Sequence, residues 1–147
     1  MQVLSKSSKQ TKKVSKIFAK ELIKTKPGKG AFVVALQGNL GAGKTTFTQG
    51  FLRGLGVKSK ITSPTFVLVK NYKLRIMNYE RVYHIDCYRI KAAKEILDLN
   101  WKEMISNPKN IILIEWPERI SKIIPKNSIK IKFEYGKKET ERTLQIK

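Results

Sequence analysis

The pattern of apolar and polar positions in residues 9–25 predicts an amphipathic helix with an apolar stripe opposite a row of lysines. The apolar stripe consists of Val14, Ile17, Phe18 and Leu22. Ser8 and Thr11 are of the residue types that cap helix starts, so either of them can cap this one. Residues 1–5 predict a short edge strand before the helix, and the Lys-Pro-Gly-Lys-Gly segment 26–30 breaks the chain after it.

Two apolar segments flank a glycine-rich stretch. Residues 31–36 form a continuous apolar run with β-branched members, which predicts a buried strand. Residues 46–55 return to helical spacing and are closed by Gly56, which predicts a helix. The order is therefore strand, glycine-rich loop and helix.

The rest of the chain predicts more strands and one more helix. The predicted strands are residues 66–72, 81–85, 111–115, 129–135 and 140–146. The first two and the last two of these read as hairpins, so the sheet should contain antiparallel pairs. Residues 92–105 predict a helix that ends at Asn107-Pro108. Its apolar positions are Ile96, Leu97, Trp101, Met104 and Ile105. We expect an α/β, three-layer fold of the P-loop NTPase type with a mixed parallel and antiparallel central sheet.

Residues 38–46 match the phosphate-binding pattern G-x-x-x-x-G-K-[ST]. The glycines at 38, 41 and 43 allow positive φ and close backbone approach, so the loop amides can face a polyphosphate. Lys44 would reach the β- and γ-phosphates, and the Thr45 hydroxyl would ligate Mg²⁺. The preceding strand and the following helix argue against a chance glycine-rich turn. The predicted nucleotide-binding residues of the loop are Asn39, Leu40, Gly41, Ala42, Gly43, Lys44, Thr45 and Thr46.

Two carboxylates follow predicted strands. Asp86 follows residues 81–85, where it can position water or Mg²⁺, or else cap the next helix. Glu115 follows four apolar residues, as in a Walker-B strand, and can hold Mg²⁺ directly or through water. The alternative for Glu115 is a buried strand with a terminal salt bridge. His84 is the only histidine, and with no Cys or His cluster around it we interpret it as a structural residue.

Ser63 and Thr65 flank Pro64 in a segment with two readings. The hydroxyls can form a turn, or they can form a switch near the γ-phosphate or Mg²⁺. Composition alone favours the turn.

Length and composition narrow the class of protein. A chain of 147 residues predicts one domain over residues 1–147. No apolar run approaches the roughly 18 residues of a membrane span, and residues 1–13 have no apolar signal-peptide core. A single cysteine, Cys87, excludes an internal disulfide and suits the cytoplasm.

The formal net charge of +20 is unusual and is spread along the chain. Residues 1–30 contain nine lysines and one glutamate, while only six of the 31 basic residues are arginine. Such a charge suits a surface that meets nucleic acid, but the abundance of Lys, Ile and Asn also suits the codon bias of an AT-rich genome. Both explanations remain open.

The chain resembles the TsaE (YjeE) family, the small bacterial P-loop ATPases of tRNA threonylcarbamoyladenosine synthesis. Four blocks in the family's order carry the resemblance. They are GNLGAGKTTFTQGFLRGLG at 38–56, TSPTFVLVKNY at 62–72, YHIDCYRI at 83–90 and ILIEWPERI at 112–120. The blocks after the P-loop are far more specific than the P-loop itself.

The resemblance implies a role for each site residue. Lys44 and Thr45 would hold phosphate and Mg²⁺, Glu115 would be the Walker-B carboxylate, and Asp86 would be a second essential acid. Ser63 and Thr65 would lie in a nucleotide-sensitive switch, which reverses the preference for a turn, and Trp116 would lie close to ATP.

The resemblance also implies partners. The family acts with the TsaB and TsaD proteins, and TsaD attaches threonylcarbamoyl to adenosine 37 of tRNAs that read ANN codons. ATP hydrolysis by the TsaE member, which does not perform the transfer itself, is needed for repeated turnover. We expect weak ATPase activity that the partners stimulate, a monomer or weak oligomer, and contact with tRNA through the partner complex.

Three departures from the family's pattern stand out: Asn39 replaces an acidic residue, Cys87 replaces leucine, and residues 91–100 lack the usual acidic helix start. Two other functions compete with the ATPase. A small-molecule P-loop kinase usually carries an arginine-rich lid, which this chain lacks, and an RNA-binding module would have a vestigial P-loop. A GTPase is disfavoured because no N-K-x-D motif is present.

Overall fold

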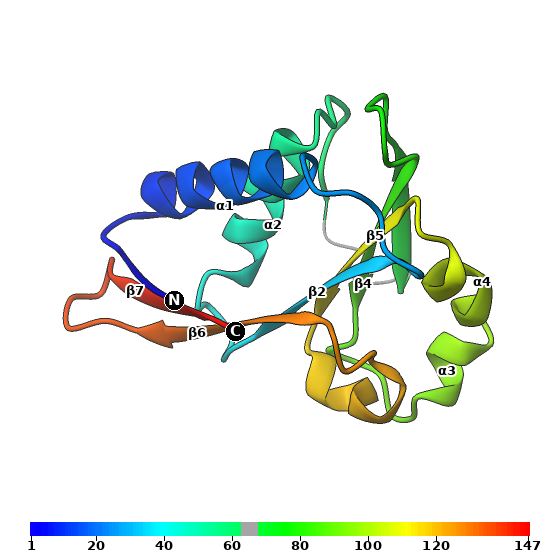
Figure 1. Ribbon diagram of the computed structural model, residues 1–147. Helices are drawn as coiled ribbons and strands as arrows, with labels where there is room; N and C mark the ends of the chain where they lie inside the picture. Colours follow the sequence, from blue (N-terminus) through cyan, green and yellow to red (C-terminus); the bar gives the residue numbers. More distant parts are fainter. Residues whose placement is uncertain (63–67) are drawn as a thin grey trace.

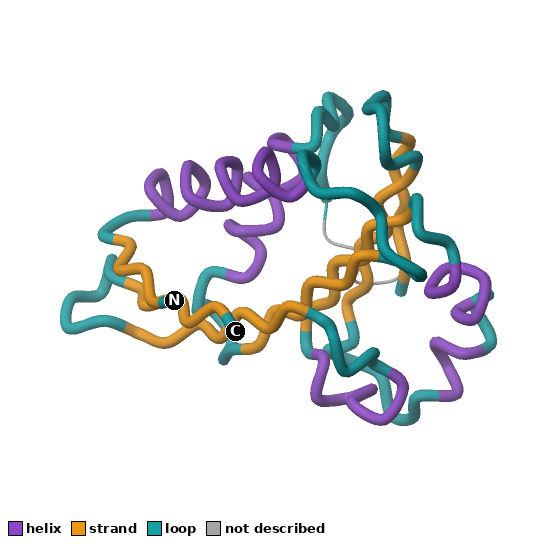
Figure 2. The backbone as a smooth tube through the Cα atoms, in the orientation of Figure 1, coloured by secondary structure: helices purple, strands orange, loops and turns teal. Residues whose placement is uncertain are grey.

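The computed structural model describes residues 1–62 and 68–147 of the chain (Figures 1 and 2). The elements in chain order are β1 (Gln2–Ser5), α1 (Ser8–Leu22), β2 (Phe32–Gln37), α2 (Lys44–Gly54), β3 (Val69–Lys73), β4 (Arg81–Asp86), α3 (Lys94–Leu97), α4 (Trp101–Ser106), β5 (Asn110–Glu115), the 3₁₀ segment η1 (Pro117–Ile123), β6 (Ile129–Tyr135) and β7 (Arg142–Ile146). The predicted start of the third strand at Phe66 lies outside the described residues. Within residues 1–62 and 68–147, no helix is long and apolar enough to cross a membrane.

The strands form one mixed sheet in the order β1-β7-β6-β2-β5-β4-β3. β2 pairs in parallel with β5 and β6, and β4 pairs in parallel with β5. The two predicted hairpins are present as the antiparallel pairs β3–β4 and β6–β7, and β1 is the predicted edge strand beside β7. The expectation of an α/β fold with a mixed central sheet is confirmed.

The sheet separates two hydrophobic cores, which makes the fold three-layered. Along β2 and β5, alternate residues point to opposite faces, because side chains in a strand alternate with a period of two. On one face, Val34 and Leu113 pack against α1 and α2. On the other face, Val33 and Ile112 pack against α3, α4 and η1. Figure 1 shows these helices on either side of the sheet.

The start of α1 and the face that it buries differ from the prediction. The helix is present, but its cap is Ser7, whose side chain accepts a hydrogen bond from the Gln10 amide, and neither Ser8 nor Thr11 is the cap. Ile17, predicted to lie in the apolar stripe, is 53% exposed. The residues of α1 that are buried are Thr11, Ser15, Ala19 and Leu22.

The physical reason is a close helix crossing. A Cβ atom built at Gly50 would lie 2.0 Å from the Ser15 hydroxyl, and one built at Gly54 would lie 2.7 Å from the Ala19 side chain. Only small residues fit on α1 where the α2 backbone approaches this closely, so small and polar residues occupy the buried face.

The single helix predicted over residues 92–105 is also wrong. The chain forms two short helices, α3 and α4, with Asn100 between them at a φ of +60°. Asparagine tolerates this left-handed conformation better than most residues, and it breaks the helix there. Ile96, Trp101 and Met104 are buried as expected, but Leu97 is 46% exposed.

Candidate nucleotide-binding site

The carboxyl ends of three adjacent parallel strands meet at the candidate site. Asp86, the last residue of β4, is the register partner of Glu115, the last residue of β5. Glu115 is in turn the register partner of Leu36, two residues before Gly38 begins the glycine-rich loop. In open α/β sheets this edge is where ligands bind. Residues far apart in the sequence therefore converge because the strands are parallel and in this register.

The loop itself has the conformation that its glycines were predicted to allow. Gly41 and Gly43 have φ values of +76° and +106°, in the region that favours glycine. Gly43 is also the residue that caps the start of α2, so the loop leads directly into a helix N-terminus. A helix N-terminus offers backbone amides and a favourable dipole to an anion. The loop and helix together suit a phosphate group.

Lys44, the first residue of α2, is folded back into the loop. Its ammonium group donates hydrogen bonds to the carbonyl oxygens of Gly38 and, at 3.4 Å, Asn39. It also lies 3.6 Å from the centre of the Trp116 ring, in a cation–π contact. The side chain is 6% exposed, and this burial lowers the pKa of Lys44 although nearby carboxylates, Glu115 foremost, oppose the shift. The lysine is thus a poorly hydrated cation, which an incoming anion would stabilise.

Trp116 reaches Lys44 because of an unusual backbone. Its φ is +58°, a left-handed value that is rare for a bulky side chain. The residue stands between the end of β5 and Pro117 at the start of η1, and its ring also lies 5.0 Å from the ring of Tyr88. The sharp turn therefore places an aromatic ring beside the loop lysine.

The two predicted carboxylates have different surroundings. Glu115 is buried and lies 2.7 Å from the Nε2 atom of His84, which is also buried. Asp86 is half-buried, and its Oδ1 atom accepts a hydrogen bond from the Tyr88 amide at 3.0 Å. This contact caps a turn, whereas the next helix, whose capping was the alternative role for Asp86, begins only at Lys94. Burial raises the pKa of Asp86, and the Glu115 carboxylate adds to the shift.

Almost all of the predicted site residues line one cleft of about 360 Å³. They are Asn39, Leu40, Gly41, Ala42, Gly43, Lys44, Thr45, Thr46, Asp86, Glu115 and Trp116. Ser63 and Thr65 lie outside the described residues, so their predicted switch role stays a prediction. Tyr88 and Arg89 also line the cleft and were not predicted, although they belong to the same YHIDCYRI block as Asp86.

The C-terminal hairpin holds the loop from outside, a contact that the sequence did not reveal. The Tyr135 hydroxyl on β6 donates a hydrogen bond to the Leu40 carbonyl oxygen. The Arg142 guanidinium on β7 donates to the Gly41 carbonyl oxygen at 3.1 Å and lies 4.9 Å from the Tyr135 ring. Because the C=O and N–H of a trans peptide point in opposite directions, these bonds fix which way the loop amides point.

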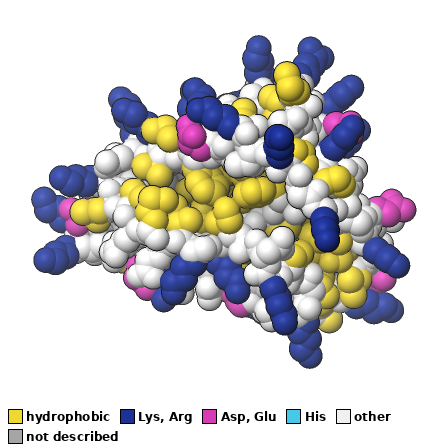
Figure 3. Space-filling view, viewed as in Figure 1, with side chains coloured by type: hydrophobic (Ala, Val, Ile, Leu, Met, Phe, Trp, Pro, Cys, Tyr) yellow, Lys and Arg dark blue, Asp and Glu magenta, His cyan; other side chains and the backbone are white. Residues whose placement is uncertain are grey.

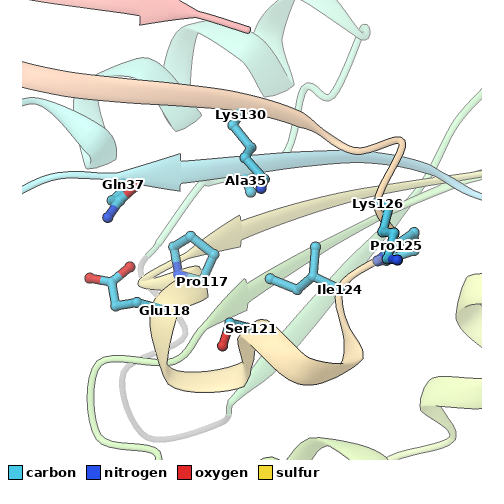
Figure 4. A pocket seen from close by; sticks show the side chains of 9 residues that line it. All are labelled: Ala35, Gln37, Pro117, Glu118, Ser121, Ile124, Pro125, Lys126 and Lys130. Carbon is cyan, nitrogen blue, oxygen red and sulfur yellow. The ribbon is translucent and has the colours of Figure 1, made fainter.

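A second cavity, of about 300 Å³, lies between η1 and strands β2 and β6 (Figure 4). It is lined by Ala35, Gln37, Pro117, Glu118, Ser121, Ile124, Pro125, Lys126 and Lys130. Its lining contains no residue of the loop 38–46, and its charges have both signs. Of these two cavities, the cleft at the loop is therefore the one whose lining suits a phosphate group.

The donor set at the cleft suits Mg²⁺. No group of three or more His, Cys, Asp or Glu side chains in the described part of the chain could hold a metal. Mg²⁺ commonly takes only one or two protein carboxylates and completes its shell with water and substrate phosphates. The Thr45 hydroxyl and the carboxylates of Glu115 and Asp86, which line the same cleft, fit that mode of binding.

The sequence is similar to those of known proteins that share one name. The family model described as "Threonylcarbamoyl adenosine biosynthesis protein TsaE" matches residues 5–144. The protein named tRNA threonylcarbamoyladenosine biosynthesis protein TsaE from Haemophilus influenzae is 38% identical, over 82% of this chain and 73% of its own length. The protein of the same name from Rickettsia typhi is 41% identical, over 80% of this chain and 75% of its own length.

The fold also matches a solved structure. The crystal structure of Bacillus subtilis YdiB superposes with a TM-score of 0.72 at 27% sequence identity. The match covers 99% of this chain and 83% of the YdiB chain. The similarity therefore extends over all the elements that form the cleft.

Proposed function

The chain belongs to the TsaE family, and we propose that it binds and hydrolyses ATP as an accessory protein in the synthesis of threonylcarbamoyladenosine in tRNA. The convergence of Lys44, Thr45, Asp86 and Glu115 on one cleft is the observation that carries this proposal. Relatives that bear the pathway's name support the process, and the P-loop supports ATP as the ligand.

In the proposed complex the loop amides and the N-terminus of α2 bind the phosphates. Lys44 leaves the Gly38 carbonyl and the Trp116 ring and pairs with the β- and γ-phosphates. Thr45 and Glu115 would hold Mg²⁺, which neutralises the charge that develops on the transferred phosphoryl group. Asp86, the register partner of Glu115, is proposed to orient the attacking water, and its pKa is raised by burial.

We further propose that TsaB and TsaD are the partners that stimulate this hydrolysis, and that the chain acts in the cytoplasm. A loop lysine that is already bonded to protein groups is consistent with slow hydrolysis by the isolated chain. Ser63 and Thr65 are proposed to complete the site as a switch that responds to the γ-phosphate.

The decisive experiment measures phosphate release from ATP with Mg²⁺, with and without the cognate TsaB–TsaD complex. We expect stimulation by the complex, and a loss of at least about a hundredfold in Lys44→Ala and Glu115→Gln, as for groups that contact transition-state charge. Unchanged hydrolysis in both variants would overturn the proposal. Product analysis excludes a small-molecule kinase if all of the lost γ-phosphate is recovered as free phosphate.

A further inference from the structure

A groove of about 570 Å³ lies between α1 and α2, away from the nucleotide cleft. Its lining residues are Lys9, Lys12, Lys13, Lys16, Gln49, Gly50, Arg53, Lys60 and Ile61. Six of these nine residues are basic and none is acidic, and none of the nine also lines the cleft at residues 39–46. We call this feature the α1–α2 groove.

Four of the lysines lie on one side of α1. Lys9, Lys12, Lys13 and Lys16 follow the spacing i, i+3, i+4 and i+7, which keeps side chains on one side of a helix over about 10 Å of its length. All four are exposed, and in the described part of the chain none of them is in an ion pair. Their mutual repulsion is therefore uncompensated by protein carboxylates.

The other wall of the groove is built by specific contacts. Arg53, in the last turn of α2, donates hydrogen bonds from Nη1 to the carbonyl oxygens of Val57 at 2.7 Å and Ser59 at 2.9 Å. These bonds hold the loop that carries Lys60 beside the helix pair. The close crossing at Gly50 brings the α1 lysines next to this wall.

The composition of the groove identifies its ligand class. No aromatic side chain of the described residues lines it, so residues 1–62 and 68–147 offer it no surface of the kind on which proteins stack unpaired bases. Lysines act as point charges that bind phosphate without fixed geometry, whereas carboxylates are best recognised by the planar fork of arginine. Arg53, the one arginine among the nine described lining residues, already uses one arm of that fork on the carbonyl oxygens of Val57 and Ser59.

We propose that the α1–α2 groove binds the phosphate backbone of RNA without reading its sequence. The choice of tRNA as the RNA rests on the proposed function. Binding at this groove is independent of ATP, because Arg53 lies nine residues after Lys44 on α2 and no lining residue is shared with the cleft. The groove thus gives four of the nine lysines of residues 1–30 a location and a proposed ligand.

The rival explanation is that RNA binds the diffuse charge of the whole surface. Figure 3 shows basic side chains all around the outline of one face, where acidic ones are fewer. A charge-matched pair of variants separates the two explanations. The groove variant carries K9Q, K12Q, K13Q and K16Q, and the control variant carries K102Q, K122Q, K137Q and K138Q, all at exposed lysines.

The experiment measures binding of a fluorescent unmodified tRNA to the full chain by anisotropy, from about 50 to about 200 mM salt. The groove variant should bind tRNA at least about tenfold more weakly, and the magnitude of its slope of log K against log salt should fall by about two to four. The control variant should change in tRNA affinity by less than about threefold. Equal weakening of both variants, or no tRNA binding by the unaltered chain at the lowest salt, would overturn the proposal.

Two further measurements complete the test. Polyglutamate that displaces tRNA at an equal charge concentration would show an acidic protein to be the better ligand, which also overturns the proposal. Partner-stimulated ATP hydrolysis and thermal unfolding are measured on the same variants. If hydrolysis is intact but the groove and control variants bind tRNA equally well, only the groove proposal is contradicted. If the unaltered chain does not hydrolyse ATP, only the proposed function is contradicted.

Discussion

The Nε2 atom of His84 lies 2.7 Å from the Oε2 atom of Glu115, across the β4–β5 strand pair, with both side chains almost fully buried. An ionised carboxylate only accepts hydrogen bonds, so the imidazole tautomer that carries its proton on Nε2 is the one that donates to such a partner. The Nδ1 atom of the same ring is buried and has no hydrogen-bond partner in the described structure. The hydrogen bond to Glu115 is therefore the contact through which His84 orients the proposed Walker-B carboxylate.

Replacing His84 should impair hydrolysis more than nucleotide binding. In His84→Ala, Glu115 loses its donor, so we expect partner-stimulated turnover to fall at least about tenfold while the affinity for ATP changes less than about threefold. The free energy of unfolding should fall by about 1–3 kcal/mol, because a buried acceptor is left unsatisfied. Steady-state kinetics and chemical denaturation measure the two effects.

His84→Gln is the matched control, since its amide can still donate a hydrogen bond to the carboxylate. It should recover part of the turnover lost in His84→Ala. A normal rate in His84→Ala would show that Glu115 needs no orientation from β4.

The Lys44–Trp116 contact should report nucleotide binding. ATP draws the ammonium group away from its position 3.6 Å above the ring, which changes the environment of the indole. The chain has two tryptophans, so Trp101→Phe leaves Trp116 as the only tryptophan. We expect its fluorescence to change saturably with ATP and Mg²⁺.

The reciprocal variant, Trp116→Phe, keeps only Trp101, which is buried and is not part of the cleft lining. Its emission should be insensitive to ATP. A nucleotide response from Trp101 of the same size as that from Trp116 would contradict the assignment.

The local part of the site could be predicted from sequence, and the part made by distant strands could not. Lys44 follows its glycines directly, and Glu115 follows an apolar run, so each carries its own context. The His84–Glu115 bond depends instead on the register of β4 against β5, which no local pattern encodes. The Arg142 contact with the loop spans 101 residues and depends on where the C-terminal hairpin adds to the sheet.

The errors in the fold prediction have a related cause. The stripe of α1 was chosen by hydrophobicity, which placed Ile17 inside, but the closeness of α2 at Gly50 selects residues by size. The break at Asn100 depends on a single left-handed residue within an otherwise helical pattern. In both places a tertiary or backbone constraint overrides the periodicity.

The C-terminal hairpin should contribute to nucleotide affinity through the loop. Arg142→Ala removes the hydrogen bond to the Gly41 carbonyl, and Tyr135→Phe removes the one to Leu40. Each loss frees a loop peptide to rotate, so we expect ATP affinity to fall about three- to tenfold for either variant, the equivalent of about one hydrogen bond.

The same two variants should leave the stimulated maximum rate at saturating ATP nearly unchanged, because neither side chain lines the cleft. Isothermal titration calorimetry and initial rates separate the two quantities. A lower maximum rate with unaltered affinity would place these residues in the chemical step.

The α1–α2 crossing should be intolerant of a single methyl group. The Cβ of Gly50→Ala would lie 2.0 Å from the Ser15 hydroxyl and 2.4 Å from the Lys12 carbonyl oxygen, so the helices must separate. Overpacking of this kind costs about 1–3 kcal/mol, and we expect thermal unfolding about 3–10 °C lower. Gly28→Ala is the control, because a Cβ there meets nothing within 4 Å. If Gly50→Ala and Gly28→Ala unfold at the same temperature, α1 and α2 can accommodate a methyl group at Gly50, which would contradict this prediction.

Shortening Ser15 in the same variant separates the clash with its hydroxyl from the clash with the backbone. Ser15→Gly in the Gly50→Ala background removes the hydroxyl but leaves the carbonyl of Lys12, so only part of the lost stability should return.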